Sequence, residues 1–354
     1  MIFPRSSQLV RTAVCAFSLS LISNFAFADA LKDWEQIIAL SAGPKGDAQT
    51  REQARQLMIQ NFEEQQRALQ LFIATYPADS HNVEASLRLS HLLAVRCDLE
   101  GKPEYYTVAA KILDKLEADP ATPPAKLPDV AYSRITLLMH HTPNPDGVQR
   151  ETLVAYVRKF QKDYPSDHRL ANLLAEMASL YDSDPETKRQ LLEEALRYAG
   201  DDAVKQRIND DFKRLAMLGR PVELKFDSVQ GEPIDVTKYR GKVVLVYFFA
   251  NWARPSVLGL IEVKRIADQF PKNKVQALGI SLDKSKEALT ATMTKAGIDF
   301  PVYFDGKGWE SPLARSLGIN ALPTAWVLDR SGNLRTLNAM NSTEAIITQL
   351  MEEK

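Results

Sequence analysis

The spacing of hydrophobic residues changes once along the chain, near residue 219. From Leu31 to Leu215, apolar residues recur three and four positions apart, which places them on one face of a helix. This region is also rich in Leu, Ala, Glu, Gln, Arg and Lys, which favour helices. The pattern therefore predicts an all-helical domain of helical hairpins over residues 29–218. Its helices are separated by breaks at Gly43-Pro44, Tyr76-Pro77, Gly101-Lys102-Pro103, Pro120–Pro128, Pro143–Gly147, Tyr164-Pro165 and Gly200.

A short motif occurs twice in this helical region. Phe72, Tyr76-Pro77 and Asp79 form the first copy, and the same residue types recur 88 positions later at residues 160, 164–165 and 167. An Ala- and Leu-rich segment follows each copy, and the repeated motif resembles tetratricopeptide-like repeats. An irregular helical bundle whose helices end at Tyr-Pro stays open as an alternative, because proline is common just past a helix end.

Residues 219–354 alternate between strand and helix patterns. The apolar run Val243–Phe249 suits a strand that is buried on both faces. The region predicts an α/β domain in which helices sandwich a mixed sheet. Its expected elements are a hairpin of Val222–Phe226 and Ile234–Val236, a helix over about Pro255–Phe270, a strand at Val275–Ile280, a helix over about Lys284–Ala296, a strand at Val302–Phe304, a helix at Leu313–Leu317, a hairpin of Thr324–Leu328 and Leu334–Leu337, and a last helix that starts with a capping box of Asn341 and Glu344.

The N-terminal residues have the pattern of a secretory signal peptide. Arg5 and Arg11 precede the apolar stretch Thr12–Phe27, which is short and rich in serine for a membrane span. The stretch ends in Ala26-Phe27-Ala28, so we expect residues 1–28 to be removed by cleavage after Ala28. The prediction is a periplasmic or otherwise exported protein without a transmembrane segment after cleavage. The alternative is an uncleaved N-terminal anchor.

Charge and cysteine content exclude several classes of protein. The 44 Lys and Arg residues balance 45 Asp and Glu residues, and the net charge of −1 argues against a nucleic-acid partner. After the expected cleavage Cys97 is the only cysteine, so an internal disulfide cannot form. Free cysteine is usually buried, and we expect Cys97 to be a core thiol. The five histidines are too scattered to predict a metal site, and no cofactor is expected.

Three segments of the C-terminal region carry a family resemblance. Gly241–Trp252, Leu278–Asp283 and Gly318–Thr324 resemble exported thioredoxin-fold proteins of the TlpA/ResA type, a redoxin (AhpC/TSA-like) group. The resemblance implies a thioredoxin fold with a cis peptide bond at Leu322-Pro323. It also implies a Cys-x-x-Cys motif directly after Trp252.

The sequence departs from that family at its reactive positions. Ala253 and Ser256 stand where the resemblance places the two cysteines, and neither a methyl group nor a hydroxyl can exchange disulfides. The resemblance places a buried, proton-accepting acid at position 247, where this chain has Tyr247. It also places a glutamate and a proline at the positions of Gly259 and Ile261. Peroxide reduction is excluded for the same lack of a thiolate.

A serine hydrolase is also excluded. No histidine follows His168, so Ser256 has no base from its own domain. The sequence therefore predicts no catalytic residue in this domain.

The resemblance leaves a recognition groove without a nucleophile. Six residues are expected to line it: Trp252, Arg254, Pro255, Leu322, Pro323 and Thr324. We expect a redox-inactive protein-binding or chaperone-like module of the cell envelope, whose partner is a protein or an extended peptide.

Two alternatives stay open. One is a thiol-disulfide oxidoreductase that uses Cys97 or an external thiol, which requires Cys97 to be exposed near the 253–256 loop. The other is a purely structural envelope protein without a saturable partner, in which the fold alone requires the groove residues.

Overall fold

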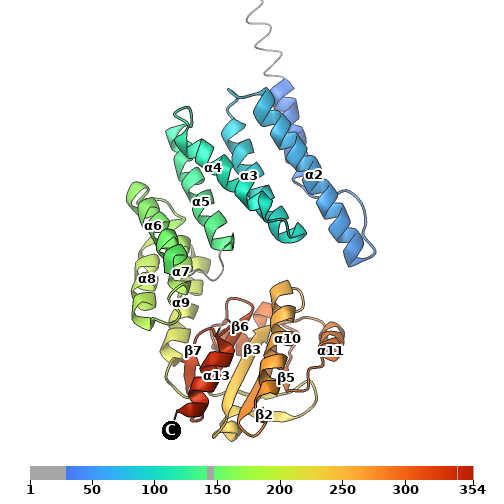
Figure 1. The fold of residues 1–354 in the computed structure, drawn as a ribbon, viewed down its shortest axis with the longest axis vertical. Coiled ribbons are helices and arrows are strands. Elements are labelled where there is room, and N and C mark those ends of the chain that lie inside the picture. Colours follow the sequence, from blue (N-terminus) through green and yellow to red (C-terminus); the bar gives the residue numbers. More distant parts are fainter. Residues whose placement is uncertain (1–28, 142–146, 341, 354) are drawn as a thin grey trace, which may run out of the picture. The chain divides into compact units, whose positions relative to one another are not determined.

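The structure is a computed structural model that describes residues 29–141, 147–340 and 342–353. The chain forms two compact units (Figure 1). Of the described residues, the first unit contains 29–141 and 151–164, and the second contains 147–150 and those from Pro165 onward. The predicted signal peptide, residues 1–28, lies outside the described residues. In the described ranges, no helix is both long enough and apolar enough to cross a membrane.

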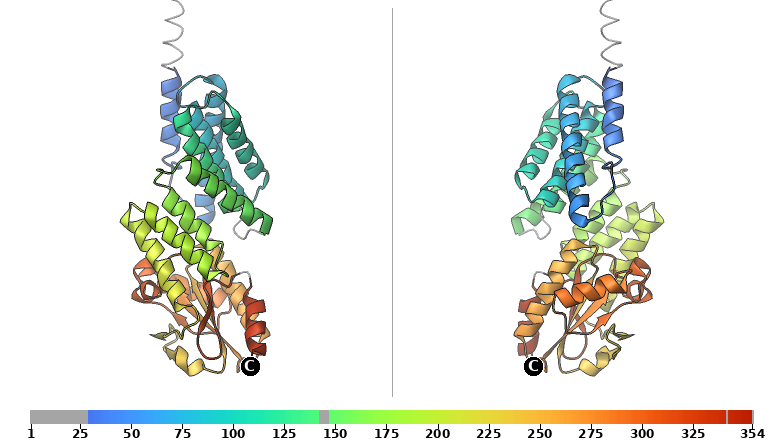
Figure 2. Two further views of the ribbon diagram at one scale, coloured as in Figure 1. Left: turned by 90° about the vertical axis from the view of Figure 1, so that its left-hand side faces the viewer. Right: turned by 90° about the vertical axis from the view of Figure 1, so that its right-hand side faces the viewer.

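The first unit is entirely helical, as the sequence predicts. A helix over residues 29–40 is followed by α2 (Arg51–Thr75), α3 (Asn82–Glu100), α4 (Glu104–Ala118), the 3-10 turn η1 (Pro124–Lys126), α5 (Leu127–His141) and α6 (Gly147–Asp163). Helix α3 packs against both α2 and α4, and α4 packs against α5 (Figures 1 and 2). Leu93, Leu113 and Phe72 lie in the shared core, where their burial stabilises the stack.

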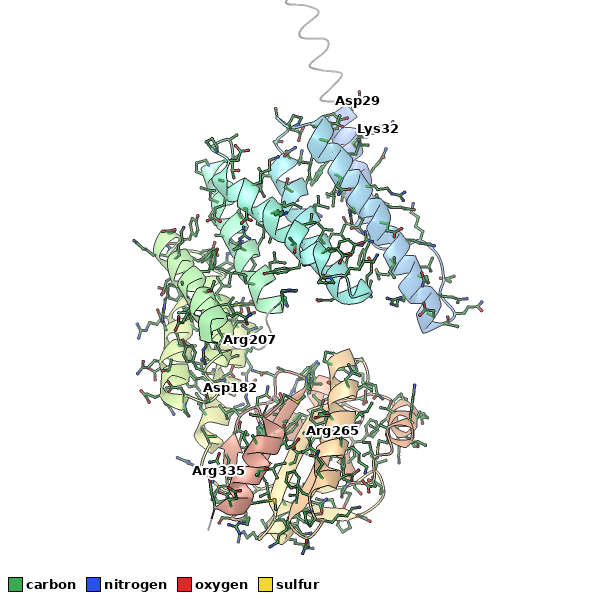
Figure 3. All side chains as sticks on the ribbon, in the orientation of Figure 1. Asp29, Lys32, Asp182, Arg207, Arg265 and Arg335 are labelled. Atoms are coloured by element: carbon green, nitrogen blue, oxygen red, sulfur yellow. The ribbon has the colours of Figure 1, made fainter. Side chains whose placement is uncertain are left out.

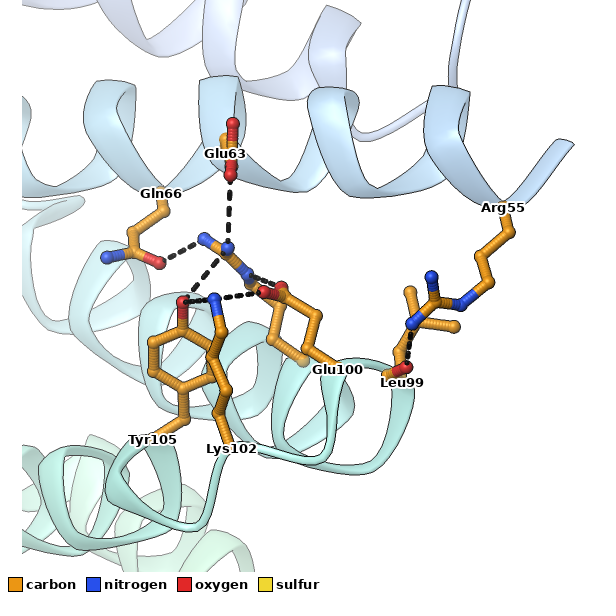
Figure 4. Close-up of polar contacts among 8 residues, drawn as sticks. Arg55, Glu63, Gln66, Leu99, Glu100, Lys102 and Tyr105 are labelled. Carbon is orange, nitrogen blue, oxygen red and sulfur yellow. Dashed lines mark hydrogen bonds and ion pairs between the residues drawn. The ribbon is translucent and has the colours of Figure 1, made fainter. Parts of the chain in front are cut away.

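A buried arginine connects three of these helices (Figure 4). The Arg96 guanidinium donates to Glu100 at 2.5 Å, to Gln66 at 2.6 Å and to the hydroxyl of Tyr105 at 3.1 Å. The hydrogen bond from Arg96 lowers the pKa of Glu100. A buried charge without partners would be strongly destabilising, so these contacts allow Arg96 to be buried between α2, α3 and α4.

The two copies of the repeated motif adopt the same local structure. The rings of Phe72 and Tyr76 lie 5.1 Å apart, and the rings of Phe160 and Tyr164 lie at the same distance. Asp79 accepts a hydrogen bond from the main-chain N–H two residues later, at 2.8 Å, and residue 167 does so at 2.9 Å. The recurrence is therefore structural and is not a coincidence of composition.

The second unit begins with three helices, α7 (Leu170–Ser179), α8 (Pro185–Tyr198) and α9 (Asp202–Met217). The break between α7 and α8 is not among those predicted from the sequence. In the sequence, this break is marked by Asp184-Pro185. The Asp184 carboxylate caps α8 by accepting a hydrogen bond from the N–H of Thr187, and Pro185 occupies the first turn of the helix. The change from helices to a mixed α/β region lies at residue 219, but it is not the boundary between the two units. Helices α7, α8 and α9 belong to the same compact unit as the sheet.

A five-stranded mixed sheet forms the rest of this unit, in the order β5-β4-β3-β6-β7. Strand β3 (Val243–Phe249) is central and fully buried, as predicted; it pairs in parallel with β4 (Val275–Ser281) and antiparallel with β6 (Thr324–Leu328). The edges are β5 (Val302–Tyr303) and β7 (Leu334–Thr336). The predicted mixed α/β architecture is confirmed.

Helices cover the sheet and complete its core. Alternate residues of β3 pack with α10 (Arg254–Gln269), α11 (Lys286–Lys295) and α13 (Thr343–Glu352) in one apolar cluster. Short elements complete the unit: η2 (Val236–Tyr239), η3 (Gly308–Glu310), α12 (Pro312–Ser316) and a separate hairpin of β1 (Lys225–Asp227) and β2 (Pro233–Asp235).

The predicted capping box at the last helix is wrong. Ser342 is the N-cap of α13, and its side chain makes no capping hydrogen bond. A turn closed by the Ser342 N–H and the Ala339 carbonyl, at 2.9 Å, sets the start of the helix at Thr343. Asn341 lies outside the described residues.

Candidate functional site

The loop after β3 carries the positions at which the resemblance expects cysteines. The Ser256 N–H donates to the Ala253 carbonyl at 2.8 Å, in the first turn of α10. Ala253 is partly exposed, whereas Ser256 is fully buried and its hydroxyl has no partner among the described residues. Residues three apart at a helix start lie close together, so this loop keeps the spacing of a dithiol site without its sulfur atoms.

Tyr247 fills the space beneath this loop. Its hydroxyl donates to the Ser256 carbonyl at 2.8 Å, and the ring is fully buried. Burial raises the pKa of Tyr247, so the phenol stays protonated at neutral pH and is not a proton acceptor there. A side chain at Gly259 would collide with this hydroxyl, which explains why glycine stands there.

A buried carboxylate fixes the other side of the loop. Asp283, directly after β4, accepts from the Asn251 N–H at 2.8 Å and from the Ser281 hydroxyl at 2.9 Å. Burial raises the pKa of Asp283. In the sequence, Asp283 is distinguished only as the last residue of a family segment, and its role in positioning the loop is not predicted.

Trp252 is the most prominent side chain of the loop. It is 54% exposed, and its indole N–H donates to the Leu282 carbonyl at 3.3 Å. Its ring lies 5.8 Å from that of Trp309, which is 40% exposed. Trp309 is not among the residues predicted from the sequence, because it lies in the short turn η3, where the sequence predicts no element.

The exposed apolar surface continues along α10. Pro255, Leu258 and Ile261 recur every three residues, so they share one face of the helix, and all three are exposed. Leu258 reaches 72% exposure. We call Trp252, Trp309 and these three residues the Trp252 surface. The side chain of Arg254 lies outside the described residues.

The predicted cis peptide bond at Leu322-Pro323 is confirmed. Thr324 pairs with Phe248 in the β3–β6 ladder, so Pro323 is next to the end of β3, where the Trp252 loop begins. Leu322 and Pro323 are partly exposed, whereas Thr324 is buried and its hydroxyl donates to the Ala321 carbonyl at 2.8 Å. The fold thus brings the cis-proline loop to the same end of the sheet as Trp252.

Cys97 is buried in the first unit, as the sequence predicts. Burial raises the pKa of its thiol, which disfavours the reactive thiolate. The exposed cysteine that the oxidoreductase alternative requires is therefore not found.

The C-terminal part of the chain also resembles known proteins. Residues 219–337 match the AhpC/TSA family. The thiol-disulfide oxidoreductase ResA of Geobacillus thermodenitrificans is 23% identical over 124 residues, which cover 35% of this chain and 70% of that protein. The thioredoxin-like protein YneN of Bacillus subtilis is 22% identical over 132 residues, or 37% of this chain and 75% of YneN.

Solved structures include similar domains. The C-terminal domain of a putative thiol-disulfide oxidoreductase from Bacteroides thetaiotaomicron is 22% identical and covers 39% of this chain and 97% of its own, with a TM-score of 0.36. Residues 219–337 are thus similar in sequence to redoxin domains related to thiol-disulfide oxidoreductases, and the mixed sheet that they contain is thioredoxin-like. The predicted fold class is confirmed.

Proposed function

We propose that this chain is an exported, redox-inactive member of the thioredoxin-like proteins that binds other proteins or extended peptides in the cell envelope. The observation that carries the proposal is the pairing of an exposed aromatic surface at Trp252 with a loop that has Ala253 and Ser256 in place of thiols.

The loop lacks each group that disulfide exchange requires. Exchange begins with attack by a thiolate and ends when a second thiol resolves the mixed disulfide. Ala253 offers a methyl group, and the Ser256 hydroxyl is buried beside a phenol that stays protonated. Cys97 is buried with a raised pKa, which argues against its use as a substitute.

The Trp252 surface has the character of a protein contact. Tryptophan is enriched among the residues that dominate binding energy at interfaces, and exposed apolar side chains that lie together commonly mark contact sites. Trp252 is held by its hydrogen bond to Leu282, so its ring is already ordered before a partner arrives. Leu322 and Pro323, beside the end of β3, add partly exposed apolar side chains at the end of the sheet where the Trp252 loop begins.

The helical region supplies a second surface of the same kind. Its two matching Phe–Tyr pairs support a tetratricopeptide-like array, and such helical arrays present extended surfaces to partner proteins. Export through the signal peptide predicted at residues 1–28 would place both domains in the envelope.

The test uses reduced, carboxymethylated α-lactalbumin, a permanently unfolded protein, labelled with fluorescein. Fluorescence anisotropy should show saturable binding to the purified chain. Trp252→Ala and Leu258→Ser should each weaken it about tenfold or more, as expected for an interface hot spot. Arg254→Glu changes a second of the six predicted groove residues and should also weaken the binding.

Ala345→Ser is the matched control, because Ala345 is exposed on α13 and lies outside both the Trp252 surface and the helical region. Its binding should equal that of the unmodified chain. Absence of saturable binding, or binding that is unchanged in Trp252→Ala, would refute the proposal and favour the purely structural alternative.

A further inference from the structure

A polar pocket of about 290 Å³ lies within the second unit, and Thr324, one of the predicted groove residues, is part of its lining. Helices α7 and α9 line it together with the segment that leads into β6 and residues just after β7. Figure 3 marks Asp182 and Arg207, two of its lining residues, in the helical part of this unit. Its volume is at the small end of the range for ligand sites, so an occupant would be a small molecule or the end of a chain.

Most charges of the pocket wall neutralise one another. The Lys188 ammonium group, in a residue only 2% exposed, forms ion pairs with Asp182 and with Asp211, the latter at 3.8 Å. Asp211 also pairs with Arg214. Arg214 donates to the Gly318 carbonyl and, at 2.7 Å, to Asn320 Oδ1. These contacts connect α9 to the loop before β6 and leave that part of the wall without net charge.

Arg207 is different, because no carboxylate lies within 4 Å of it among the described residues. One Nη donates to Asn172 Oδ1 at 2.9 Å, and the main-chain carbonyl of Arg207 accepts from Asn320 Nδ2 at 3.3 Å. The guanidinium has five N–H donors, so most of them stay available. Arg207 is therefore a positioned cation without a counter-ion.

Two neutral donors line the same pocket. Asn338 Oδ1 accepts from the main-chain N–H groups of Ala325 and Met340, which fixes Nδ2 as the end of the amide without a described acceptor. The Ser179 hydroxyl, at the end of α7, likewise has no partner in the described part of the chain. An occupant would meet a cation and two hydrogen-bond donors.

We infer that this pocket binds the carboxylate of a small organic acid or of a polypeptide C-terminus, with Arg207 as the counter-ion. A guanidinium binds a carboxylate through two parallel hydrogen bonds, and charge-assisted bonds of this kind are stronger than neutral ones. Glu176, Asp182 and Asp211 also line the pocket, so a monoanion fits better than a phosphate dianion, which they would repel. Ala175, Ala321 and Leu337 provide apolar surface for a short aliphatic body. The lining contains none of the five residues of the Trp252 surface.

Isothermal titration calorimetry of the purified full chain tests this inference with three probes: butyrate, tri-alanine and tri-alanine amide. At least one of the two carboxylates, butyrate or tri-alanine, should bind saturably. If tri-alanine binds, tri-alanine amide should bind at least about tenfold more weakly. Binding of butyrate identifies a small-acid site, whereas binding of tri-alanine alone identifies a chain-terminus site.

Arg207→Gln should weaken the binding about tenfold or more, and Ser179→Ala should weaken it several-fold. Because Ser179 is exposed and lies outside the ion-pair network, its variant tests the site even if Arg207→Gln folds poorly. Arg265→Gln is the control, since Arg265 is an exposed arginine on α10, and its binding should be unchanged. No saturable binding of either acid, equal binding of tri-alanine and its amide, or unaltered affinity in both pocket variants would overturn the inference.

Discussion

The hydroxyl of Tyr247 donates a 2.8 Å hydrogen bond to the main-chain carbonyl of Ser256. This contact connects the central strand β3 to the first turn of α10, beneath the loop that carries Trp252. The phenol occupies the volume that a side chain at Gly259 would need. Tyr247 and Gly259 therefore form one packing unit, which supports the loop in place of acid–base chemistry.

This packing predicts a strong coupling between the two positions. Gly259→Ala should lower the free energy of unfolding by about 1–3 kcal/mol, because overpacking forces buried atoms to shift. Tyr247→Phe should cost about 0.5–1.5 kcal/mol through the lost hydrogen bond. In the double variant the alanine should cost less than it does alone, which urea unfolding measures as a double-mutant cycle.

Gly200→Ala controls for the general effect of replacing glycine. No atom lies within 4 Å of the position its Cβ would take, so its stability should stay within about 0.5 kcal/mol of the unmodified chain. Additive losses in the cycle would show that Tyr247 does not exclude a side chain at Gly259.

Asp283 predicts a pH dependence of stability. Burial raises the pKa of this carboxyl in the folded state, so the folded chain holds a proton that the unfolded chain has already released. The Asp283 contribution to the free energy of unfolding should therefore fall as pH rises from about 4, the ordinary aspartate value, through the folded pKa.

Urea unfolding between pH 4 and pH 7 checks this prediction when the chain is compared with Asp283→Asn. The asparagine retains an oxygen for the Asn251 N–H but cannot ionise. The stability of the unmodified chain minus that of the variant should decrease toward neutral pH. A difference that increases toward neutral pH would mean that the folded state favours the carboxylate.

Sequence patterns located nearly all elements of the thioredoxin-like domain. The buried run Val243–Phe249 has the same bounds as β3, because a strand covered on both faces needs an unbroken apolar run. Leu322-Pro323 was predicted as a cis bond from the family resemblance alone. The helix break at Asp184 was not predicted, because it contains no glycine. It is marked in the sequence only by a capping aspartate that precedes a proline.

The candidate sites were only partly accessible from the sequence. Trp252 follows directly from its place after β3, but its neighbour Trp309 comes from a turn 57 positions further along the chain. The pocket at Arg207 depends on the packing of α7 and α9 against residues beyond 317. Such long-range contacts leave no periodic signal, so the sequence alone does not predict a pocket at these helices.

The burial of Cys97 predicts slow reaction of its thiol. Burial raises its pKa, and only the thiolate attacks a disulfide reagent. With protein from which residues 1–28 have been removed, Ellman's reagent should label Cys97 much more slowly under native conditions than in concentrated urea. Equal rates would show that the thiol is accessible in the folded chain.

The most direct test of the account is the reduction of insulin by dithiothreitol. It compares the unmodified chain, Cys97→Ala, and the double variant Ala253→Cys/Ser256→Cys. The account predicts that the unmodified chain and Cys97→Ala leave the rate at its uncatalysed value, while the double variant raises it because a thiolate and a resolving thiol are restored. Catalysis by the unmodified chain that is lost in Cys97→Ala would contradict the account and establish an oxidoreductase that uses Cys97.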